Sequence, residues 1–398
     1  MLLPLLLAGV LAAWLRFAFV WRQIGALPNL ARDAARPEQD DAGGWPRLSV
    51  VLAARDEAEA IRGAVSSLLA QDYPALEVVA VDDRSSDATG AILDELAAAH
   101  PALKVVHVDA LPDGWLGKTN ALARGAAAAT GELLLFTDAD VLFGDGALRR
   151  AVAWAGRERL GHAVALPHFV APGLLERSFV SLFGLFLLVH LEANALGRAG
   201  SAAHVGVGAF NLVRRDAYQA IGGHSRLRLE VADDVKLGLI LRRSGVRQGC
   251  ADSGGLVRVR WQRGFVASMR GLMKNFFAGC EFRWRATLRH VVLVPLVTTF
   301  PAACLALSSD NLTRALATAA VALPVALHGA TARRIAGGHG TEGLLLPIVG
   351  MCLAGVALAS AVVTTVRGAV IWRGTRYPLR DLDAACVRES DWPRDRAV

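Results

Sequence analysis

Two aspartates, Asp138 and Asp140, follow an apolar run at 133–136 and lie two positions apart. Side chains with this spacing on a strand point to the same face, so we expect two neighbouring carboxylates at the end of a buried strand. Carboxylate oxygens are preferred ligands of Mg²⁺ and Mn²⁺, and such an ion can carry a diphosphate. Because a turn cap is the alternative, the residues around the pair decide its meaning.

A second acidic pair, Asp82 and Asp83, follows the apolar run at 76–81. Ligands of α/β sheets bind beyond the carboxyl ends of the strands, and both acidic pairs are expected at that edge. Asp83 is the candidate for nucleotide contact, because a carboxylate can accept hydrogen bonds from a base imide or a ribose hydroxyl. Asp87, four residues further on, is interpreted as a helix N-cap.

A third acidic pair, Asp233-Asp234, lies far along the chain. Transfer of a group to a hydroxyl needs a base that takes the proton, and an aspartate held in line with the reacting atoms can serve. The alternative is a cap on a helix that runs to about Ser244-Gly245.

Basic residues complete the candidate site. Lys118 precedes a helix expected from Thr119, where it could bind the anionic part of a donor, although a solvated loop lysine is the alternative. The glycines around it lack P-loop spacing. Arg260 could clamp a diphosphate and Trp261 could bound an acceptor site, but this pair also suits anchoring at a membrane surface.

Alternating elements must position these residues. Strands are expected at 48–52, 76–81, 104–108 and from 133 into the aspartate pair, with helices at 58–69, about 86–99 and 119–130. This alternation predicts an α/β fold with a doubly wound, mostly parallel sheet, in which the first two strands are neighbours.

The apolar residues are concentrated in a few stretches. The chain has 398 residues, 54% of them hydrophobic, and its mean hydropathy is +0.38. Apolar stretches cover 1–20, 291–307, 315–327 and 344–366, of which the first and last have the length of a membrane span. Arg16 and Arg22 favour an uncleaved anchor over a signal peptide. The stretch 174–197 is interpreted as an interfacial helix, with a full span or a buried core helix as alternatives.

Charge and cysteine usage exclude other classes. The net charge is +7, but no basic-aromatic array supports nucleic-acid binding, so the basic flanks of the apolar stretches are assigned to membrane orientation. The five cysteines show no paired spacing, which argues against a zinc site or a disulfide framework and favours a reducing, cytoplasmic location.

The motifs together resemble those of glycosyltransferase family 2. The resemblance covers about residues 48–285 and rests on motifs in the family's order at 50–55, 81–87, 138–140, 206–223, 233–234 and 260–264. The segments 271–279 and 372–377 are also similar to hopene-associated and carotenoid-acid glycosyltransferases of the diaponeurosporenoate type, and more distantly to ceramide glucosyltransferases. The acceptors in those families are lipids.

The resemblance implies roles residue by residue. Asp83 resembles the nucleotide-contact aspartate, and Asp138 and Asp140 resemble the aspartates that hold the diphosphate and the metal. Asp234 matches the general base, and Asp233 stands where the family has Glu.

The acceptor side departs from the family pattern at one position. Arg260 and Trp261 match the end of the family's Gln-x-x-Arg-Trp motif, but Val257 replaces its Gln. In polymer synthases this motif holds the growing chain end, so the loss favours transfer of a single sugar. Gly208 lies in the segment 206–209, which resembles the acceptor-side loop.

The resemblance implies an inverting, Mg²⁺- or Mn²⁺-dependent transferase of GT-A fold. The expected donor is a UDP-sugar, and the expected acceptor is a hopanoid, a carotenoid or another polyisoprenoid-type lipid. A polysaccharide synthase is the alternative within the family, and a silent membrane partner that binds nucleotide-sugar without turnover is the alternative from another class.

The expected organisation is an anchor at 1–21, a linker at 22–47, the catalytic domain at 48–285, a transmembrane region at 288–372 and a basic tail at 373–398. We expect a multi-pass protein of a bacterial-type inner membrane with a cytoplasmic catalytic domain. The basic residues at 333–334 agree with that orientation, but those at 373, 376 and 380 would lie outside after a third full span, so one segment is expected to be re-entrant or interfacial.

Overall fold

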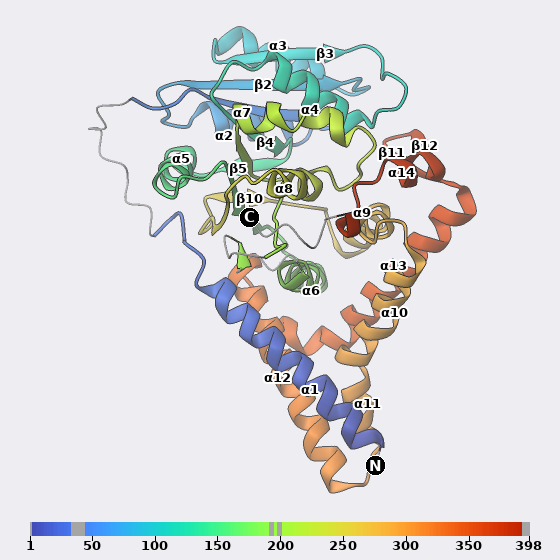
Figure 1. Cartoon of the computed structure of the whole chain (residues 1–398). Coiled ribbons are helices and arrows are strands. Elements are labelled where there is room, and N and C mark those ends of the chain that lie inside the picture. Colours follow the sequence, from blue (N-terminus) through green and yellow to red (C-terminus); the bar gives the residue numbers. More distant parts are fainter. Residues whose placement is uncertain (1, 33–43, 191–194, 197–200, 392–398) are drawn as a thin grey trace. The chain divides into compact units, whose positions relative to one another are not determined.

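The computed structural model describes residues 2–32, 44–190, 195–196 and 201–391, which form two compact units (Figure 1). The sheet unit comprises 27–168, 195–259 and 381–398, and the helical unit comprises 1–26, 169–194 and 260–380. These limits differ from the expected catalytic domain at 48–285, because both 169–194 and 260–285 group with the helical unit.

The sheet unit is built on seven strands in the order β3-β2-β1-β4-β8-β6-β9. The strands of this sheet are β1 Leu48–Ala54, β2 Leu76–Asp83, β3 Leu103–Val108, β4 Leu133–Asp138, β6 His162–Leu166, β8 Asn211–Arg214 and β9 Gln248–Asp252. Strand β8 runs antiparallel to β4 and β6, and the other neighbouring pairs are parallel. The expected mostly parallel sheet, with β1 beside β2, is therefore confirmed.

Helices and short strands complete the sheet unit. Its helices are α2 Ile61–Leu69, α3 Thr89–Ala99, α4 Gly117–Ala128, α5 Ala147–Arg157, α7 Arg215–Ala220, the 3₁₀ helix η2 Gly223–Leu227, α8 Asp233–Arg243 and the 3₁₀ helix η4 Glu389–Asp391. A second sheet has the order β5-β10-β7, with β5 Val141–Phe143, β10 Val257–Val259 and β7 His168–Phe169.

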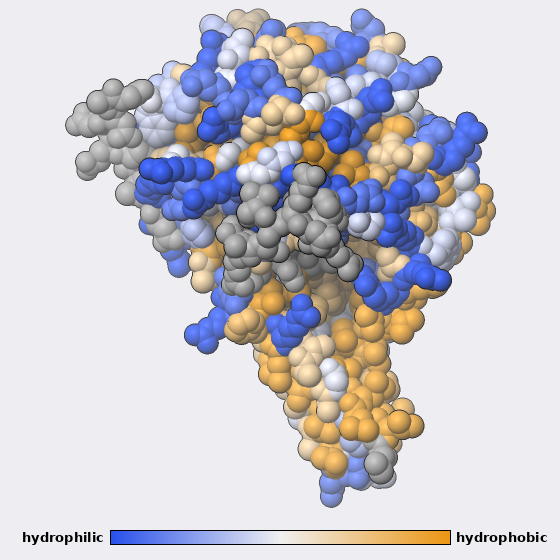
Figure 2. Space-filling view, in the orientation of Figure 1, coloured by the Kyte–Doolittle hydropathy of each residue, from blue (hydrophilic) through white to orange (hydrophobic). Residues whose placement is uncertain are grey.

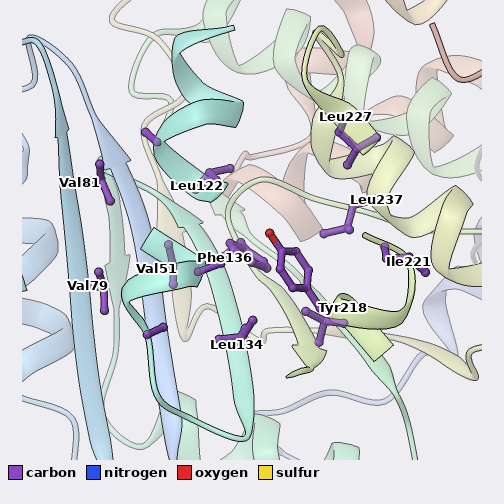
Figure 3. Packing of buried hydrophobic residues seen from close by; sticks show 14 of the residues in the cluster. Val51, Val79, Val81, Leu122, Leu134, Phe136, Tyr218, Ile221, Leu227 and Leu237 are labelled. Carbon is purple, nitrogen blue, oxygen red and sulfur yellow. The ribbon is translucent and has the colours of Figure 1, made fainter. Parts of the chain in front are cut away.

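The central strands are apolar because helices cover both faces of a parallel sheet. Val51, Val79, Leu134 and Phe136 are buried, and they pack with residues of α4 and α8 in one core cluster. Figure 3 shows Phe136 beside Tyr218 in this cluster, and their ring centroids are 5.2 Å apart. The core thus fixes β4 and α8, two elements that carry candidate site residues.

The helical unit contains the apolar stretches. Its elements are α1 Leu2–Gly25, α6 Leu174–His190, α9 Phe265–Gly279, α10 Trp284–Thr298, α11 Phe300–Leu307, α12 Asn311–Ala336, the 3₁₀ helix η3 Thr341–Leu345, α13 Leu346–Arg367, β11 Ala369–Trp372 and β12 Thr375–Pro378. Helix α14, Leu379–Ala385, leads back into the sheet unit.

Among the described residues, four helical stretches are long and apolar enough to cross a membrane: 2–25, 284–307, 311–336 and 341–367. The two middle stretches, which looked short in the sequence, thus reach the required length. Figure 2 shows mostly apolar side chains on the visible face of α1 and α12. This exposure is typical of a surface that meets lipid.

Helix α6 packs in the core of the helical unit. Phe179, Leu182 and Leu185 are buried there in one cluster with Trp14 of α1. Of the three interpretations of 174–197, this packing agrees with a buried helix, and the part of the stretch at 191–194 and 197 lies outside the described residues.

Candidate active site

The strand register brings two of the acidic pairs to one edge of the sheet. Asp82 pairs with Ala54 at the end of β1, and Asp138 pairs with Ala53 on the other side of the same strand. In a doubly wound sheet this is the position where ligands bind, because loops there diverge from the carboxyl ends of the strands.

Lys118 joins the end of β4 to the start of α8. Its Nζ lies 2.8 Å from Asp138 Oδ1 and 3.6 Å from Asp233 Oδ1. The three side chains are 22%, 40% and 5% exposed, so the group lies partly out of solvent. Lys118 is therefore in the first turn of a helix, as expected, but it is paired with carboxylates and is not a solvated loop lysine.

The first turn of α4 is held against the segment that leads into α8. The backbone N of Leu116 donates to Arg228 O at 2.7 Å, and Thr119 Oγ1 donates to the same carbonyl at 2.7 Å. Because these bonds lie on both sides of Lys118, they fix its backbone beside the acidic start of α8.

Asp234 is positioned by close backbone contacts. A Cβ at Gly206 would lie 1.8 Å from Asp234 O, and a Cβ at Gly238 would lie 1.9 Å from Val205 O. Asn211 Nδ2 donates to Asp234 O at 3.3 Å. The segment before β8 thus lies directly against the first turns of α8, which only glycines at these two points allow.

Gly208 marks the point on which two carboxylates converge. A Cβ at Gly208 would lie 2.7 Å from Asp138 Oδ2 and 3.4 Å from Asp234 Oδ2. The expected base and an expected diphosphate ligand therefore face one small space. It opens into a pocket lined by Lys118, Leu122, Phe136, Thr137, Asp138, Gly208, Asn211, His224, Asp233, Asp234 and Leu237.

Burial controls the protonation of these acids. Burial, Asp138 and Glu57 raise the pKa of Asp140 to about 7. Burial also raises the pKa of Asp233 and of Asp234, although Lys118 opposes both shifts. Burial alone would lower the pKa of Lys118, but Asp138 and Asp233 outweigh it and raise that pKa, so Lys118 is charged. The site thus places one buried carboxylate, Asp233, and several half-buried carboxylates around the cation of Lys118.

A helix cap is the alternative role for the acids of α8. The N-cap of α8 is Ala232, no side chain of the described residues caps the helix, and Asp233 and Asp234 lie in its first turn. Asp234 Oδ1 accepts a hydrogen bond from the backbone N of Val235 at 2.9 Å, and its Oδ2 faces Gly208 and the pocket. One oxygen of Asp234 is therefore available for chemistry.

Asp83 lies deeper than its expected nucleotide contact would suggest. It is buried, and both its oxygens accept hydrogen bonds from Arg84, at 2.8 and 3.1 Å. A Cβ at Gly117 would lie 2.2 Å from Asp83 Oδ2, so the carboxylate also sits against the start of α4. Asp87 accepts a bond from the backbone N of Thr89, the first residue of α3, at 2.9 Å, but the N-cap of that helix is Ala88, so the interpretation of Asp87 as the N-cap is wrong by one residue.

Arg260 and Trp261 belong to the helical unit. There the Trp261 ring stacks on Phe183 of α6, with centroids 5.3 Å apart and planes 9° from parallel. This contact fixes the start of α9 within the helical unit, and the role of Arg260 and Trp261 toward an acceptor stays a prediction.

The donor set suits a divalent cation that is shared with a substrate. Across the described residues, no group of three or more His, Cys, Asp and Glu side chains could hold a metal ion. Asp138 ends β4 and Asp140 lies in the turn before β5, so the expectation that both carboxylates project from one strand is wrong, although both follow the same edge of the sheet. Mg²⁺ is commonly held by one or two carboxylates together with substrate phosphates. The residues therefore fit such an ion once a diphosphate supplies further ligands.

Sequence reasoning passed over Asn211 and His224. Asn211 is a buried polar residue that opens strand β8, directly before the buried Leu212 and Val213, which is the signal that could have identified it. His224 is buried, its Nδ1 pairs with Tyr218 Oη at 2.8 Å, and it lines the pocket. No local pattern marks it, because α4, β4 and η2 meet there only in the folded chain.

Residues 49–222 match the family model described as glycosyl transferase family 2. No curated protein matches the chain. Among solved structures, the chain is similar to the mannosyltransferase PcManGT from Pyrobaculum calidifontis in complex with GDP-Man and Mn²⁺, with 21% identity, a TM-score of 0.58 and coverage of 92% of this chain and 99% of that one. It is also similar to S. aureus TarS 1-349, with 14% identity, a TM-score of 0.40 and coverage of 83% and 95%. Together the family match and the mannosyltransferase likeness confirm the expected GT-A fold.

Proposed function

We propose that the chain is a family 2 glycosyltransferase, whose family model matches residues 49–222, and that it transfers one sugar from a nucleotide-sugar, UDP-linked by preference, to a membrane lipid with inversion at C1. The observation that supports this most is the convergence of Asp138 and Asp234 on Gly208, with Lys118 beside them. An acceptor bound there would meet a base on one side and the leaving diphosphate on the other.

The proposed reaction divides the work among these residues. Asp234 takes the proton of the acceptor hydroxyl as its oxygen attacks C1 of the sugar. The bond from C1 to the diphosphate breaks, and the nucleoside diphosphate leaves. Lys118 stabilises the charge that develops on the leaving group. A Mg²⁺ or Mn²⁺ ion at Asp138 and Asp140 would supply further charge neutralisation when bound.

Nucleotide contact is assigned to Asp83, and the acceptor and diphosphate side to Asp233, Gly208, Arg260 and Trp261. The first assignment is supported by the position of Asp83 at the end of β2, beside the start of α4. The acceptor side is supported by Gly208, whose missing side chain leaves the space between Asp138 and Asp234 open.

A lipid acceptor is supported by the four apolar stretches of the helical unit. A soluble donor and an insoluble acceptor can react only at a membrane surface, and an enzyme attached to that surface brings them together. Hopanoid, carotenoid or other polyisoprenoid-type acceptors are proposed from the motifs at 271–279 and 372–377.

We place the sheet unit on the cytoplasmic side of a bacterial-type inner membrane, with α13 turning back within the bilayer. Arg334 at the end of α12 donates to Ile24 O at the end of α1, at 3.3 Å, so α12 ends on the side where α1 ends. Thr299, inside the stretch 284–307, donates to Pro347 O at 3.0 Å, so α13 begins at mid-depth.

The other end of α13 returns to the same side. Ser360 accepts a hydrogen bond from the backbone N of Phe277 at 3.0 Å, and the Phe277 ring lies 5.9 Å from Trp284, where α10 begins. On this path three stretches cross the membrane and 337–367 does not. The arginines at 22, 283, 333, 334, 373 and 376 then share the cytoplasmic side, as the positive-inside rule favours.

The experiment that tests the function is turnover of UDP- and GDP-sugars with Mg²⁺ or Mn²⁺, in membranes that contain host lipid extract, with products resolved by mass. A glycolipid of acceptor plus one sugar supports the proposal and names both substrates. A ladder of sugar units would support a polysaccharide synthase instead. Nucleotide binding without turnover of any donor would support a silent partner.

A further inference from the structure

The ammonium of Lys118 occupies the place between the acids of β4 and α8. It is 2.8 Å from Asp138 Oδ1, within hydrogen-bond distance, and 3.6 Å from Asp233 Oδ1. Lys118 is one of only four lysines in a chain with 43 basic residues. A lysine carries a compact charge on a flexible stem, whereas an arginine would hold a carboxylate in a rigid fork.

This pairing competes with the metal site. The oxygen that Lys118 contacts belongs to Asp138, one of the two carboxylates that would hold a divalent cation. An ammonium at that oxygen takes a ligand position and repels a second cation at close range. A metal ion can therefore use Asp138 fully only after the ammonium has moved.

We propose that Lys118 is an internal counter-ion that holds Asp138 while the donor is absent and moves to the diphosphate when a metal–nucleotide complex binds. The proposal rests on the proposed function, because it needs a diphosphate as the second partner of Lys118. Its consequence is that metal binds weakly to the free protein and more tightly together with the nucleotide.

The same exchange keeps Asp138 neutralised in both states. Without a ligand, Lys118 offsets Asp138 and Asp233, which are partly out of solvent. With a ligand, the metal takes over Asp138 and Lys118 neutralises phosphate oxygens, so neither state leaves Asp138 without a cation. Lys118 thus acts as a positioning residue toward the metal and as a donor contact toward the diphosphate.

The test is the affinity of the full-length protein in detergent for Mn²⁺, measured by electron paramagnetic resonance with and without UDP or GDP. We expect Lys118→Met to bind Mn²⁺ alone at least about tenfold more tightly than the unchanged protein, because the competing charge is gone. Lys118→Arg keeps the charge and should bind Mn²⁺ alone no more tightly. Lys104→Met, an exposed lysine whose Nζ donates to Ala128 O, is the matched control and should change nothing.

With nucleoside diphosphate present, the order of the Mn²⁺ affinities of Lys118→Met and the unchanged protein should reverse. Lys118→Met should bind the metal–nucleotide complex at least about tenfold more weakly, because Lys118 no longer reaches the phosphates. Lys118→Gln replaces Lys118→Met if the latter does not fold. Equal or weaker binding of Mn²⁺ alone in the neutral variants would overturn the counter-ion role. If no variant binds a nucleoside diphosphate, the proposed function fails, while the Mn²⁺ comparison still decides whether Lys118 competes with the metal.

Discussion

The backbone carbonyl of Asp234 lies 1.8 Å from the point at which a side chain on Gly206 would begin. No Cβ can occupy that distance, so the segment before β8 and the first turn of α8 are in contact only because residue 206 is glycine. The contact is reciprocal, since a Cβ on Gly238 would lie 1.9 Å from Val205 O. The placement of the candidate base therefore depends on two backbones that touch.

Gly206→Ala should separate these backbones and displace Asp234. We expect a loss of stability of about 1–3 kcal/mol, typical of overpacking in a core, and a fall in sugar transfer of at least about tenfold. Thermal unfolding and initial rates measure the two effects. Gly156→Ala in α5 is the matched control, because a Cβ there meets no atom within 4 Å. Equal behaviour of the two variants would show that the close contact does not matter.

Asp234→Asn should separate chemistry from donor binding. The amide keeps the size of the side chain but cannot take a proton, so we expect transfer to fall by about a hundredfold or more while the affinity for the nucleoside diphosphate stays within about twofold. Asp138→Asn should instead weaken binding of the metal–nucleotide complex. Single-turnover kinetics and nucleotide titration distinguish the two. If Asp234→Asn loses binding and transfer equally, Asp234 is a structural cap and not the base.

The sequence predicts those features of the site that depend on a single strand or helix. The runs at 48–52, 76–81 and 133–136 could only be buried strands, and the aspartates that follow them had to reach one edge of the sheet. The ion pairs of Lys118 could not be predicted in this way, because its partners Asp138 and Asp233 are 20 and 115 positions away. The pairing follows from the bonds that tie Leu116 and Thr119 to Arg228 O, which no local pattern announces.

Hydropathy likewise predicts where the apolar stretches lie and how long they are, but it does not predict the route of the chain through the membrane. It identified four apolar stretches, but residues 341–367 have the composition of a span whether they cross the bilayer or turn back. The hydrogen bond from the Thr299 hydroxyl to Pro347 O joins two segments that are 48 positions apart in the sequence. The relative position of two packed helices depends on their tertiary contacts, so it cannot be predicted from composition.

His162 should make the sheet unit sensitive to acid. It is buried on β6 and paired with Asn211, and burial lowers its pKa to about 4. The unfolded chain binds a proton near pH 6.5 and the folded chain does not, so stability should be lost as the pH falls from about 6.5 toward 4, by at most about 3 kcal/mol.

The measurement is the unfolding temperature between pH 7 and pH 4.5. His162→Gln removes the titrating group, so its unfolding temperature should fall less steeply with acid than that of the unchanged protein. His100→Gln, an exposed position after α3, should keep the original slope. Parallel slopes for the two variants would mean that other groups dominate acid unfolding. His224, whose pKa burial lowers to about 3, contributes in the same direction to the slope that remains.

The C-terminus should lie on the same side of the membrane as the sheet unit. Residues 381–391 pack within that unit, where the backbone N of Val387 donates to a carboxylate oxygen of Glu230 and Arg243 donates to Arg388 O. An odd number of crossings between 284 and 367 would carry this segment to the opposite side. On the path proposed for α13, which returns toward Phe277, the number is even, because only 284–307 and 311–336 would cross.

The side of the membrane on which a segment lies can be measured with single cysteines, in a protein whose own cysteines are replaced by alanine or serine. A cysteine at Gly374, in the turn between β11 and β12, and one at Gly114, in the loop before α4, should react with a membrane-impermeant maleimide only after the membrane is opened. A cysteine at Ser309, between α11 and α12, should react in intact cells, because two crossings meet there. Labelling of Gly374→Cys in intact cells would mean that 341–367 crosses the membrane. The packing of 381–391 in the sheet unit would then be incompatible with the membrane-embedded state of the chain, so the outcome tests the fold of the tail together with the path of α13.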